Sequence, residues 1–160
     1  MRHLPKHLRP RYRYLAVEIE TWPAADLDRS GFQAAAWDAA RSLLGDATSA
    51  AVDLQVLEAD FWNGGGQAIV RIRHDRVSAA RAALACVDVV DGYPVRVGVR
   101  GVGGTVKATE GKYAGGPPAA TSAGERRFRG TEWTAWNRRD RVDLEAEERV
   151  AGATPEELEG

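Results

Sequence analysis

The amino-acid sequence predicts an α+β protein of the ferredoxin-like class, in which a four-stranded antiparallel sheet carries two helices on one face. Apolar and polar side chains alternate at 12–20, 52–61, 67–73 and 93–100, which is the period of a half-buried strand. Between these stretches apolar residues recur at helical spacing. The order strand, helix, strand, strand, helix, strand, joined by right-handed crossovers, is that of the split βαβ arrangement.

The first strand and the first helix are delimited by residues with clear conformational preferences. Pro23 follows the first alternation and interrupts the strand. Asp26 or Asp28 can then cap a helix whose apolar positions begin at Phe32. We expect this helix to end at Gly45, because glycine is common just past a helix C-terminus.

The middle of the chain is predicted to form a hairpin followed by a second helix. The sequence Asn63-Gly64-Gly65-Gly66 separates two strands and is typical of a tight turn. Asp75 can cap the second helix, which has a single apolar stripe. After a turn at Asp91-Gly92, the last strand leads through closely spaced glycines, which allow a bend and a close backbone approach, into a short closing helix over 105–113.

The chain divides into two parts of different composition. Residues 1–113 hold all the predicted elements and begin with a basic arm at 1–11, whereas 114–160 show no regular apolar pattern. We therefore expect 114–160 to be a linker and a disordered C-terminal tail. One stretch of this tail is either a solvated segment with incidental aromatics or a short motif that folds on a partner. It contains Arg126, Arg127, Arg129, Trp133, Trp136, Arg138 and Arg139.

Composition limits the class of protein and its compartment. A chain of 160 residues suits one domain and a tail. It contains neither a run of about 18 apolar residues, as a membrane span requires, nor the apolar middle region of a signal peptide, so we expect a cytoplasmic protein. The single cysteine, Cys86, excludes an internal disulfide and is expected to be a small buried hydrophobic residue.

Arginine supplies almost all of the positive charge, since lysine occurs only at Lys6, Lys107 and Lys112. Adaptation to high salt and codon bias toward arginine both explain this composition. Near molar salt the Debye length falls to about 3 Å, so that attraction to phosphates must act at short range. Arginine suits that regime because its planar fork donates bidentate hydrogen bonds and stacks on bases.

Positive charge is concentrated at the N-terminus, although the net charge of the chain is only −1. The first fourteen residues contain five arginines and lysines and no carboxylate, with Tyr12 and Tyr14 interleaved. A basic segment of this kind is either a solvated terminus or an arm that binds a polyanion, and we expect the polyanion to be RNA.

One face of the predicted sheet extends this basic surface. If Leu15 and its neighbours point toward the helices, the pleat directs Tyr12, Tyr14, Gln67, Ile69, Arg71, Arg73, Arg96 and Arg100 to the opposite face. RNA-binding modules of this topology stack bases on aromatic side chains of the central strands, but here the third strand carries arginines. Contact with folded RNA or with a protein therefore fits better than the reading of single-stranded bases, and a merely solubilising face is the alternative. The candidate RNA-binding residues are Lys6, Arg9, Arg11, Tyr12, Arg13, Tyr14, Arg71, Arg73, Arg100, Lys107 and Lys112.

No set of residues predicts a catalytic or metal centre in this chain. The run from Gly101 to Thr105 lacks the lysine followed by serine or threonine that a phosphate-binding loop carries. His3, His7 and His74 with Cys86 do not form a convincing set of metal ligands. We therefore expect neither catalytic nor metal-binding residues.

Several stretches of the chain form a specific combination. They are Arg2–Leu15 (RHLPKHLRPRYRYL), the helix from Phe32 to Gly45, Ala80–Leu84, Val99–Ala108 (VRGVGGTVKA) and Lys112-Tyr113. Together they resemble the Pop-five family, whose archaeal member is ribonuclease P protein component 2. The resemblance covers Met1 to about Tyr113 and leaves the tail without a counterpart.

The resemblance implies an RNA-recognition-like fold and a noncatalytic subunit of the ribonucleoprotein that removes the 5′ leader of precursor tRNA. It further implies pairing with the component 3 protein, association with other protein subunits, and support of the catalytic domain of the RNA subunit, with precursor tRNA engaged indirectly. No cofactor is expected in the protein, and magnesium is expected on the RNA. Self-association, as a homodimer within a heterotetramer, stays open, and no membrane partner is expected.

Two other classes of function are alternatives. One is a small-ligand-binding ferredoxin-like module such as an acylphosphatase, which would need a glycine-flanked arginine loop after the first strand. Thr21-Trp-Pro-Ala-Ala25 stands at that position instead. The other is a protein–protein adaptor without direct RNA contact.

Overall fold

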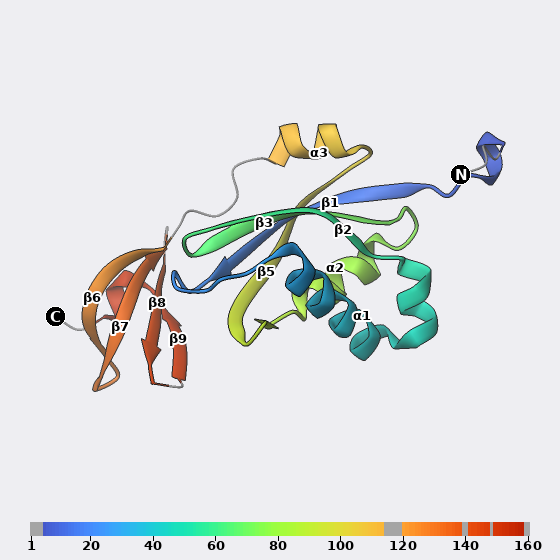
Figure 1. Cartoon of the computed structure of the whole chain (residues 1–160). Coiled ribbons are helices and arrows are strands. Elements are labelled where there is room, and N and C mark those ends of the chain that lie inside the picture. Colours follow the sequence, from blue (N-terminus) through green and yellow to red (C-terminus); the bar gives the residue numbers. More distant parts are fainter. Residues whose placement is uncertain (1–4, 114–119, 139–140, 148, 159–160) are drawn as a thin grey trace. The chain divides into compact units, whose positions relative to one another are not determined.

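The computed structural model describes residues 5–113, 120–138, 141–147 and 149–158 (Figure 1). The chain forms two compact units, Met1–Pro117 and Pro118–Gly160, which we call the N-terminal unit and the C-terminal unit. Within the described residues, no helix is both long enough and apolar enough to cross a membrane.

The N-terminal unit is an α+β sandwich. Its elements are η1 (Lys6–Leu8), β1 (Tyr12–Thr21), α1 (Arg29–Val52), β2 (Gln55–Trp62), β3 (Gly65–Arg73), α2 (Val77–Ala85), β4 (Val89–Val90), β5 (Tyr93–Gly103) and α3 (Val106–Tyr113). The strands form an antiparallel sheet in the order β2-β3-β1-β5-β4. The predicted α+β class is confirmed, but the sheet has five strands instead of four, because the two residues of β4 are too few to show an alternation.

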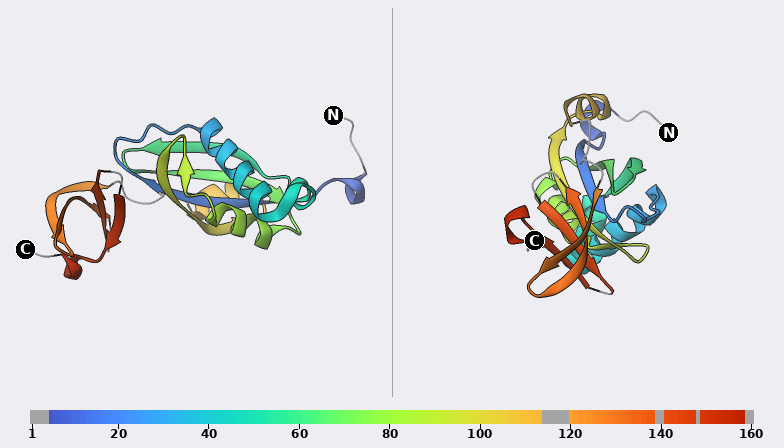
Figure 2. Two further views of the ribbon diagram at one scale, coloured as in Figure 1. Left: turned by 90° about the horizontal axis from the view of Figure 1, so that it is seen from below. Right: turned by 90° about the vertical axis from the view of Figure 1, so that its left-hand side faces the viewer.

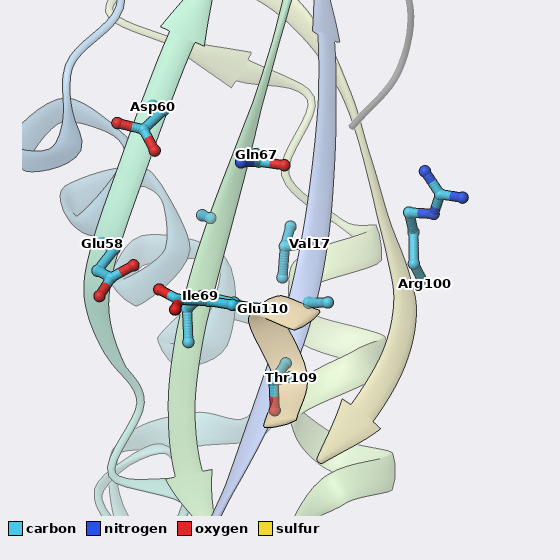
Figure 3. Close-up of a pocket in the computed structure, with 10 residues that line it drawn as sticks. Val17, Glu58, Asp60, Gln67, Ile69, Arg100, Thr109 and Glu110 are labelled. Carbon is cyan, nitrogen blue, oxygen red and sulfur yellow. The ribbon is translucent and has the colours of Figure 1, made fainter. Parts of the chain in front are cut away.

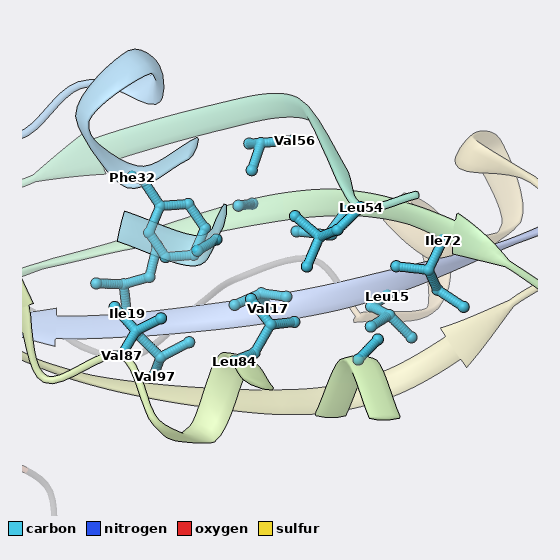
Figure 4. Close-up of a cluster of buried hydrophobic side chains, with 14 of the residues drawn as sticks. Leu15, Val17, Ile19, Phe32, Leu54, Val56, Ile72, Leu84, Val87 and Val97 are labelled. Atoms are coloured by element: carbon cyan, nitrogen blue, oxygen red, sulfur yellow. The ribbon is translucent and has the colours of Figure 1, made fainter. Parts of the chain in front are cut away.

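The core lies between the sheet and the helices α1 and α2, which cover one of its faces (Figures 1 and 2). Leu15 and Ile19 of β1 are completely buried, and Phe32 of α1 and Leu84 of α2 pack into the same cluster (Figure 4). Burial of each such side chain contributes roughly 1.5–3 kcal/mol relative to exposure. The alternation seen in the sequence therefore identifies the correct inward face of the sheet.

The opposite face of the sheet is partly covered by α3, which follows β5 (Figure 1). Thr109 of α3 is fully buried, and its hydroxyl donates to the carbonyl oxygen of Thr105 at 2.7 Å. A Cβ atom at Gly103 would collide with this hydroxyl, so glycine is required there. The predicted close approach between the glycine-rich segment and the closing helix is confirmed, although the strand continues to Gly103.

Asp28 caps α1, because its Oδ1 accepts a hydrogen bond from the backbone N–H of Gly31 at 2.7 Å. The predicted interruption at Gly45 is confirmed, because this glycine has φ +78° and non-helical geometry, but a further helical segment after the kink, which the sequence did not predict, extends α1 to Val52. Val52 is buried in the core as the last residue of α1, not the first of a strand. Asp53, in the left-handed conformation, ends the helix.

Two other local predictions are corrected at α2. Its N-cap position is occupied by Arg76 without a side-chain cap, so Asp75 lies one residue too early to cap it. Cys86 is exposed, not buried, because α2 ends at Ala85 and the next residue lies outside the apolar stripe. Val87, one residue later, occupies the buried position instead.

The C-terminal unit is a four-stranded antiparallel sheet in the order β6-β7-β8-β9. Its elements are β6 (Thr121–Phe128), β7 (Thr131–Arg138), β8 (Arg141–Ala146), β9 (Arg149–Ala153) and η2 (Pro155–Glu157). The prediction of a disordered tail is therefore wrong for these residues, while the predicted linker at 114–119 lies outside the described ones. The error arises because the core of this sheet is small and uses alanines, which carry little hydrophobic signal, beside Trp133, Val142 and Leu144.

Candidate nucleic-acid interface

Two adjacent strands bring tyrosines and arginines together on the face of the sheet opposite α1 and α2. Tyr12 of β1 lies opposite Arg73 of β3, and Tyr14 lies opposite Arg71. The guanidinium carbons of Arg71 and Arg73 are 4.4 and 5.1 Å from the centroid of the Tyr12 ring, within the range of a cation–π interaction. The predicted basic–aromatic surface is therefore present at this end of the sheet.

The two guanidinium groups of this surface differ in their further contacts. Arg73 Nε is 3.3 Å from Oδ2 of Asp53, the residue that ends α1. Arg71 is half-buried, and its Nε has no hydrogen-bond partner in the described part of the chain. A buried N–H without a partner is costly, so an acceptor such as a phosphate oxygen would relieve this cost.

The basic arm lies beside this surface, because it continues the pairing between β1 and β3 by one residue. The backbone N–H of His74 donates to the carbonyl oxygen of Arg11 at 3.1 Å, and His74 Nδ1 is 3.4 Å from the same oxygen. This contact holds Arg11 against the turn between β3 and α2. The arm is therefore attached to the folded unit at its base.

An open groove of ≈ 580 Å³ lies between the arm, the end of α1 and the β3–α2 turn. We call it the basic groove; its charged and titratable lining consists of His7, Arg9, Arg11, Arg73, His74, Asp75 and Arg76. The lining thus contains four arginines and one carboxylate, and one of these arginines, Arg73, is also paired with Asp53. Because Arg73 both lines the groove and stacks on Tyr12, the groove and the sheet surface form one continuous cationic area.

Sequence reasoning missed His74 and Arg76 as members of this groove. The signal that could have found His74 is the strand register: because Tyr12 pairs with Arg73, the residue before Tyr12 must lie opposite the residue after Arg73. The other arm candidates, Lys6 and Arg13, are exposed but do not line the groove.

At the other end of the sheet, acidic residues of β1 neutralise the predicted arginines. Arg96 donates two hydrogen bonds to the Glu20 carboxylate, at 3.0 and 2.9 Å. Arg96 Nη2 and Arg100 Nη1 lie 3.6 and 3.7 Å from the two oxygens of Glu18. These arginines are thus bound within the sheet, and Arg100 is not part of the basic groove.

A small cavity of ≈ 170 Å³ lies where α3 covers the sheet, and its polar lining includes three acidic residues and the predicted candidate Arg100 (Figure 3). Glu58 of β2 faces Glu110 of α3, and Asp60 lies further along β2. A hydrogen bond with the Glu110 side chain raises the pKa of the exposed Glu58 above its ordinary value, and slight desolvation and the charges of Glu110 and Asp60 act in the same direction. In this part of the face three acidic side chains thus surround a single arginine, which disfavours the binding of a phosphate.

The remaining candidates lie on α3. Lys107 is exposed, and Lys112 lies in the same helix, with its side chain outside the described part of the structure. The predicted continuous basic face is therefore divided into a cationic area around Tyr12 and the basic groove, a neutralised area around Glu18, and an acidic area around Glu58. Sequence alternation shows which residues share a face, but not which opposite charges meet on it.

Comparison with known proteins identifies the family of the chain. The model of the Rpp14/Pop5 family matches residues 13–114. A ribonuclease P protein component 2 of Natronomonas pharaonis is 51% identical over 154 residues, which cover 96% of each chain, and that of Halorubrum lacusprofundi is 54% identical over 144 residues, 90% of this chain and 91% of the relative. That of Methanosarcina mazei is 37% identical over 113 residues, which are 92% of the relative but 71% of this chain. With its N-terminal unit matched by the family model almost throughout, the chain belongs to the Rpp14/Pop5 family.

Proposed function

We propose that this member of the Rpp14/Pop5 family is a noncatalytic protein subunit of ribonuclease P, and that it binds and braces the catalytic domain of the RNA subunit. The observation that carries the proposal is the continuous cationic area formed by the basic groove and by Tyr12 with its two guanidinium groups. The likeness to the component 2 proteins supports the same assignment.

The proposed mechanism is neutralisation and positioning of RNA phosphates. A folded RNA must bring phosphates close together, and cations placed between them lower the electrostatic cost of compaction. Arg9, Arg11, Arg73 and Arg76 lie around one groove and can each donate bidentate hydrogen bonds to a phosphate. Magnesium ions on the RNA would supply the hydrolytic chemistry that removes the 5′ leader of precursor tRNA, while the protein holds the surrounding backbone in place.

We further propose that the protein partner, component 3, binds along α1 rather than on the cationic area. A groove of ≈ 560 Å³ lies between α1 and the segment that joins α2 to β4. Leu43 and Val89 in its lining are 48% and 49% exposed, and Asp38, Asp88 and Asp91 also line it. An apolar groove with acidic residues disfavours RNA and suits a protein surface with basic residues beside apolar ones.

The magnesium requirement of a reconstituted ribonuclease P tests the RNA-bracing role. Replacing Arg9, Arg11 and Arg13 by Ala should raise the magnesium concentration for half-maximal cleavage by about twofold or more, because magnesium must then neutralise phosphates that the arm covers in the wild type. Arg81→Ala, at an exposed position of α2, is the matched control and should leave the requirement unchanged. An unchanged requirement in the arm variant would refute the role of the arm.

The protein-adaptor alternative makes a different prediction in the same reconstitution. If the chain only joined other proteins, Leu43→Asp would impair cleavage, whereas the arm substitutions would not. Under our proposal both impair it, and only the arm substitutions are rescued by added magnesium.

A further inference from the structure

One end of the C-terminal unit combines exposed arginines with aromatic rings. Arg126 of β6 lies opposite Trp133 of β7. Thr134 of β7 pairs with Glu145 of β8, so the next residue of β8, Ala146, lies beside Trp133. Ala146 in turn pairs with Arg149 of β9. Residues opposite each other in a sheet share a face, so two arginines flank Trp133 across the sheet.

The rings at this end hold guanidinium groups by stacking. Arg149 lies over the Trp133 ring at 5.1 Å, and Arg129 lies over the Phe128 ring at 5.1 Å. The two rings pack edge to face with centroids 6.5 Å apart, and Trp133 Nε1 donates to the carbonyl oxygen of Phe128 at 3.3 Å. A stacked guanidinium keeps its N–H edge available for an oxygen ligand, since the ring occupies only its flat face.

Carboxylates compensate this positive charge only in part. Arg126, Arg129 and Arg149 are exposed, and none of the three forms an ion pair with a described residue. The pKa of Glu157 is lowered mainly by hydrogen bonds from Thr154 and to a smaller degree by the charge of Arg129, and this carboxylate is engaged in capping η2. By contrast, Arg127 on the other face of β6 lies 3.9 Å from Glu132.

We propose that this arginine–aromatic end, made of Arg126, Phe128, Arg129, Trp133 and Arg149, is a second RNA-binding surface that contacts phosphates of the ribonuclease P RNA. The inference rests on the proposed function, and adds an RNA contact outside the region that the family model matches. A protein partner would favour a larger exposed apolar area, whereas here the rings are largely covered and the exposed groups are guanidinium edges.

Stacked arginines also suit binding under strong screening of charge. Electrostatic attraction over long distances is weak at high salt concentration. The net negative charge of the C-terminal unit therefore affects RNA binding less than contacts made at hydrogen-bond distance do. Guanidinium groups already positioned on rings lose less side-chain entropy on meeting a phosphate than free lysines would.

The test measures binding of the full chain to its ribonuclease P RNA, transcribed in vitro, over a series of KCl concentrations. The triple change Arg126→Gln, Arg129→Gln and Arg149→Gln should weaken binding by about fivefold or more and lower the slope of log K against log salt by about 2, at roughly 0.7–0.9 per lost phosphate contact. Changing the same residues to Lys should restore most of the slope because the charge returns. Arg127→Gln is the matched control from the same strand and should leave the slope within experimental error.

The outcomes separate this inference from the proposed function. If substitutions of Arg9 and Arg11 reduce RNA binding while the triple Gln variant keeps the affinity and slope of the wild type, the second surface is refuted and the proposed function stands. If the wild-type chain does not bind the RNA, both are refuted. An equal loss in the Arg127→Gln control would also refute the inference, because the effect would then be one of overall charge.

A second measurement covers the case in which the triple Gln variant unfolds the small sheet. Photocrosslinking of the wild-type chain to RNA that contains 4-thiouridine should yield crosslinked peptides that include 126–133 or 149–153. Crosslinks confined to the N-terminal unit would overturn the inference.

Discussion

At the scale of single residues, Tyr12 organises the cationic area by its ring. The guanidinium groups of Arg71 and Arg73 both form cation–π contacts with the Tyr12 ring. The ring therefore keeps two like charges at a fixed separation on the sheet. Each such contact contributes about 0.5–1 kcal/mol at an exposed site. We therefore propose that Tyr12 positions arginines for RNA and does not stack on a base.

A substitution series at Tyr12 tests this positioning role. Tyr12→Phe keeps the π face and should bind the ribonuclease P RNA as the wild type does, whereas Tyr12→Leu should weaken binding by about two- to fivefold, the equivalent of one cation–π contact. Dissociation constants measured by filter binding decide the matter. Equal weakening in both variants would instead assign the role to the hydroxyl group.

The sequence predicts which residues share a face but not which charges neutralise one another. Tyr12, Arg71 and Arg73 were predicted correctly to lie together, because alternation along a strand determines facing. The neutralisation of Arg96 by Glu20 depends on the register between β1 and β5, which includes a shift between Ala16 and Val17. No periodicity in one strand reveals such a shift.

At the scale of elements, some contacts of α3 favour its packing on the sheet, and one pair of side chains opposes it. Buried Thr109 and the close approach at Gly103 favour docking, while the carboxyl groups of Glu58 and Glu110 face each other. In the folded state the pKa of Glu58 lies above its ordinary value of 4.5, so the folded form binds this proton more tightly than the unfolded form. Stability from this site is accordingly present at acidic pH and is lost as the pH rises through the raised pKa.

Removing the second carboxyl group tests this account of α3. In Glu110→Gln the pKa of Glu58, followed by NMR titration, should fall toward 4.5, because the amide can donate a hydrogen bond to the ionised Glu58 and the neighbouring charge is gone. Amide exchange in α3 should then slow at neutral pH. A titration of Glu58 identical to that of the wild type would show that Glu110 is not the cause.

Short or alanine-rich elements are where the sequence pattern failed. β4 has only two residues, and the C-terminal sheet buries Ala135 and Ala153 beside a few larger side chains. The continuation of α1 past Gly45 likewise depends on tertiary packing, since Val52 at its end is buried in the core. The helix and strand propensities of the individual residues do not reveal such tertiary packing.

At the scale of the whole molecule, the chain consists of two units with separate hydrophobic cores. Leu15, Phe32 and Leu84 belong to the first core, and Trp133 and Leu144 to the second. Among the residues that the structure describes, none belongs to both clusters. Each unit thus has its own source of stability, and RNA binding can be divided between them.

Truncation after Pro117 tests this independence. The shortened chain should keep the thermal unfolding midpoint of the N-terminal unit within about 3 °C, because its core is complete without the second cluster. Circular dichroism of residues 1–117 beside the full chain is sufficient. Loss of cooperative unfolding in the shortened chain would show that the units depend on each other.

The central claim is that the arginines of the basic groove bind phosphates of the ribonuclease P RNA. The most direct measurement is the salt dependence of RNA binding by the chain in which Arg9, Arg11 and Arg76 are replaced by Ala, with Arg81→Ala as the control. We predict that the slope of log K against log salt falls by about 2 in the groove variant, at roughly 0.7–0.9 per phosphate contact, and is unchanged in the control. A groove variant with the wild-type slope and affinity would contradict the account.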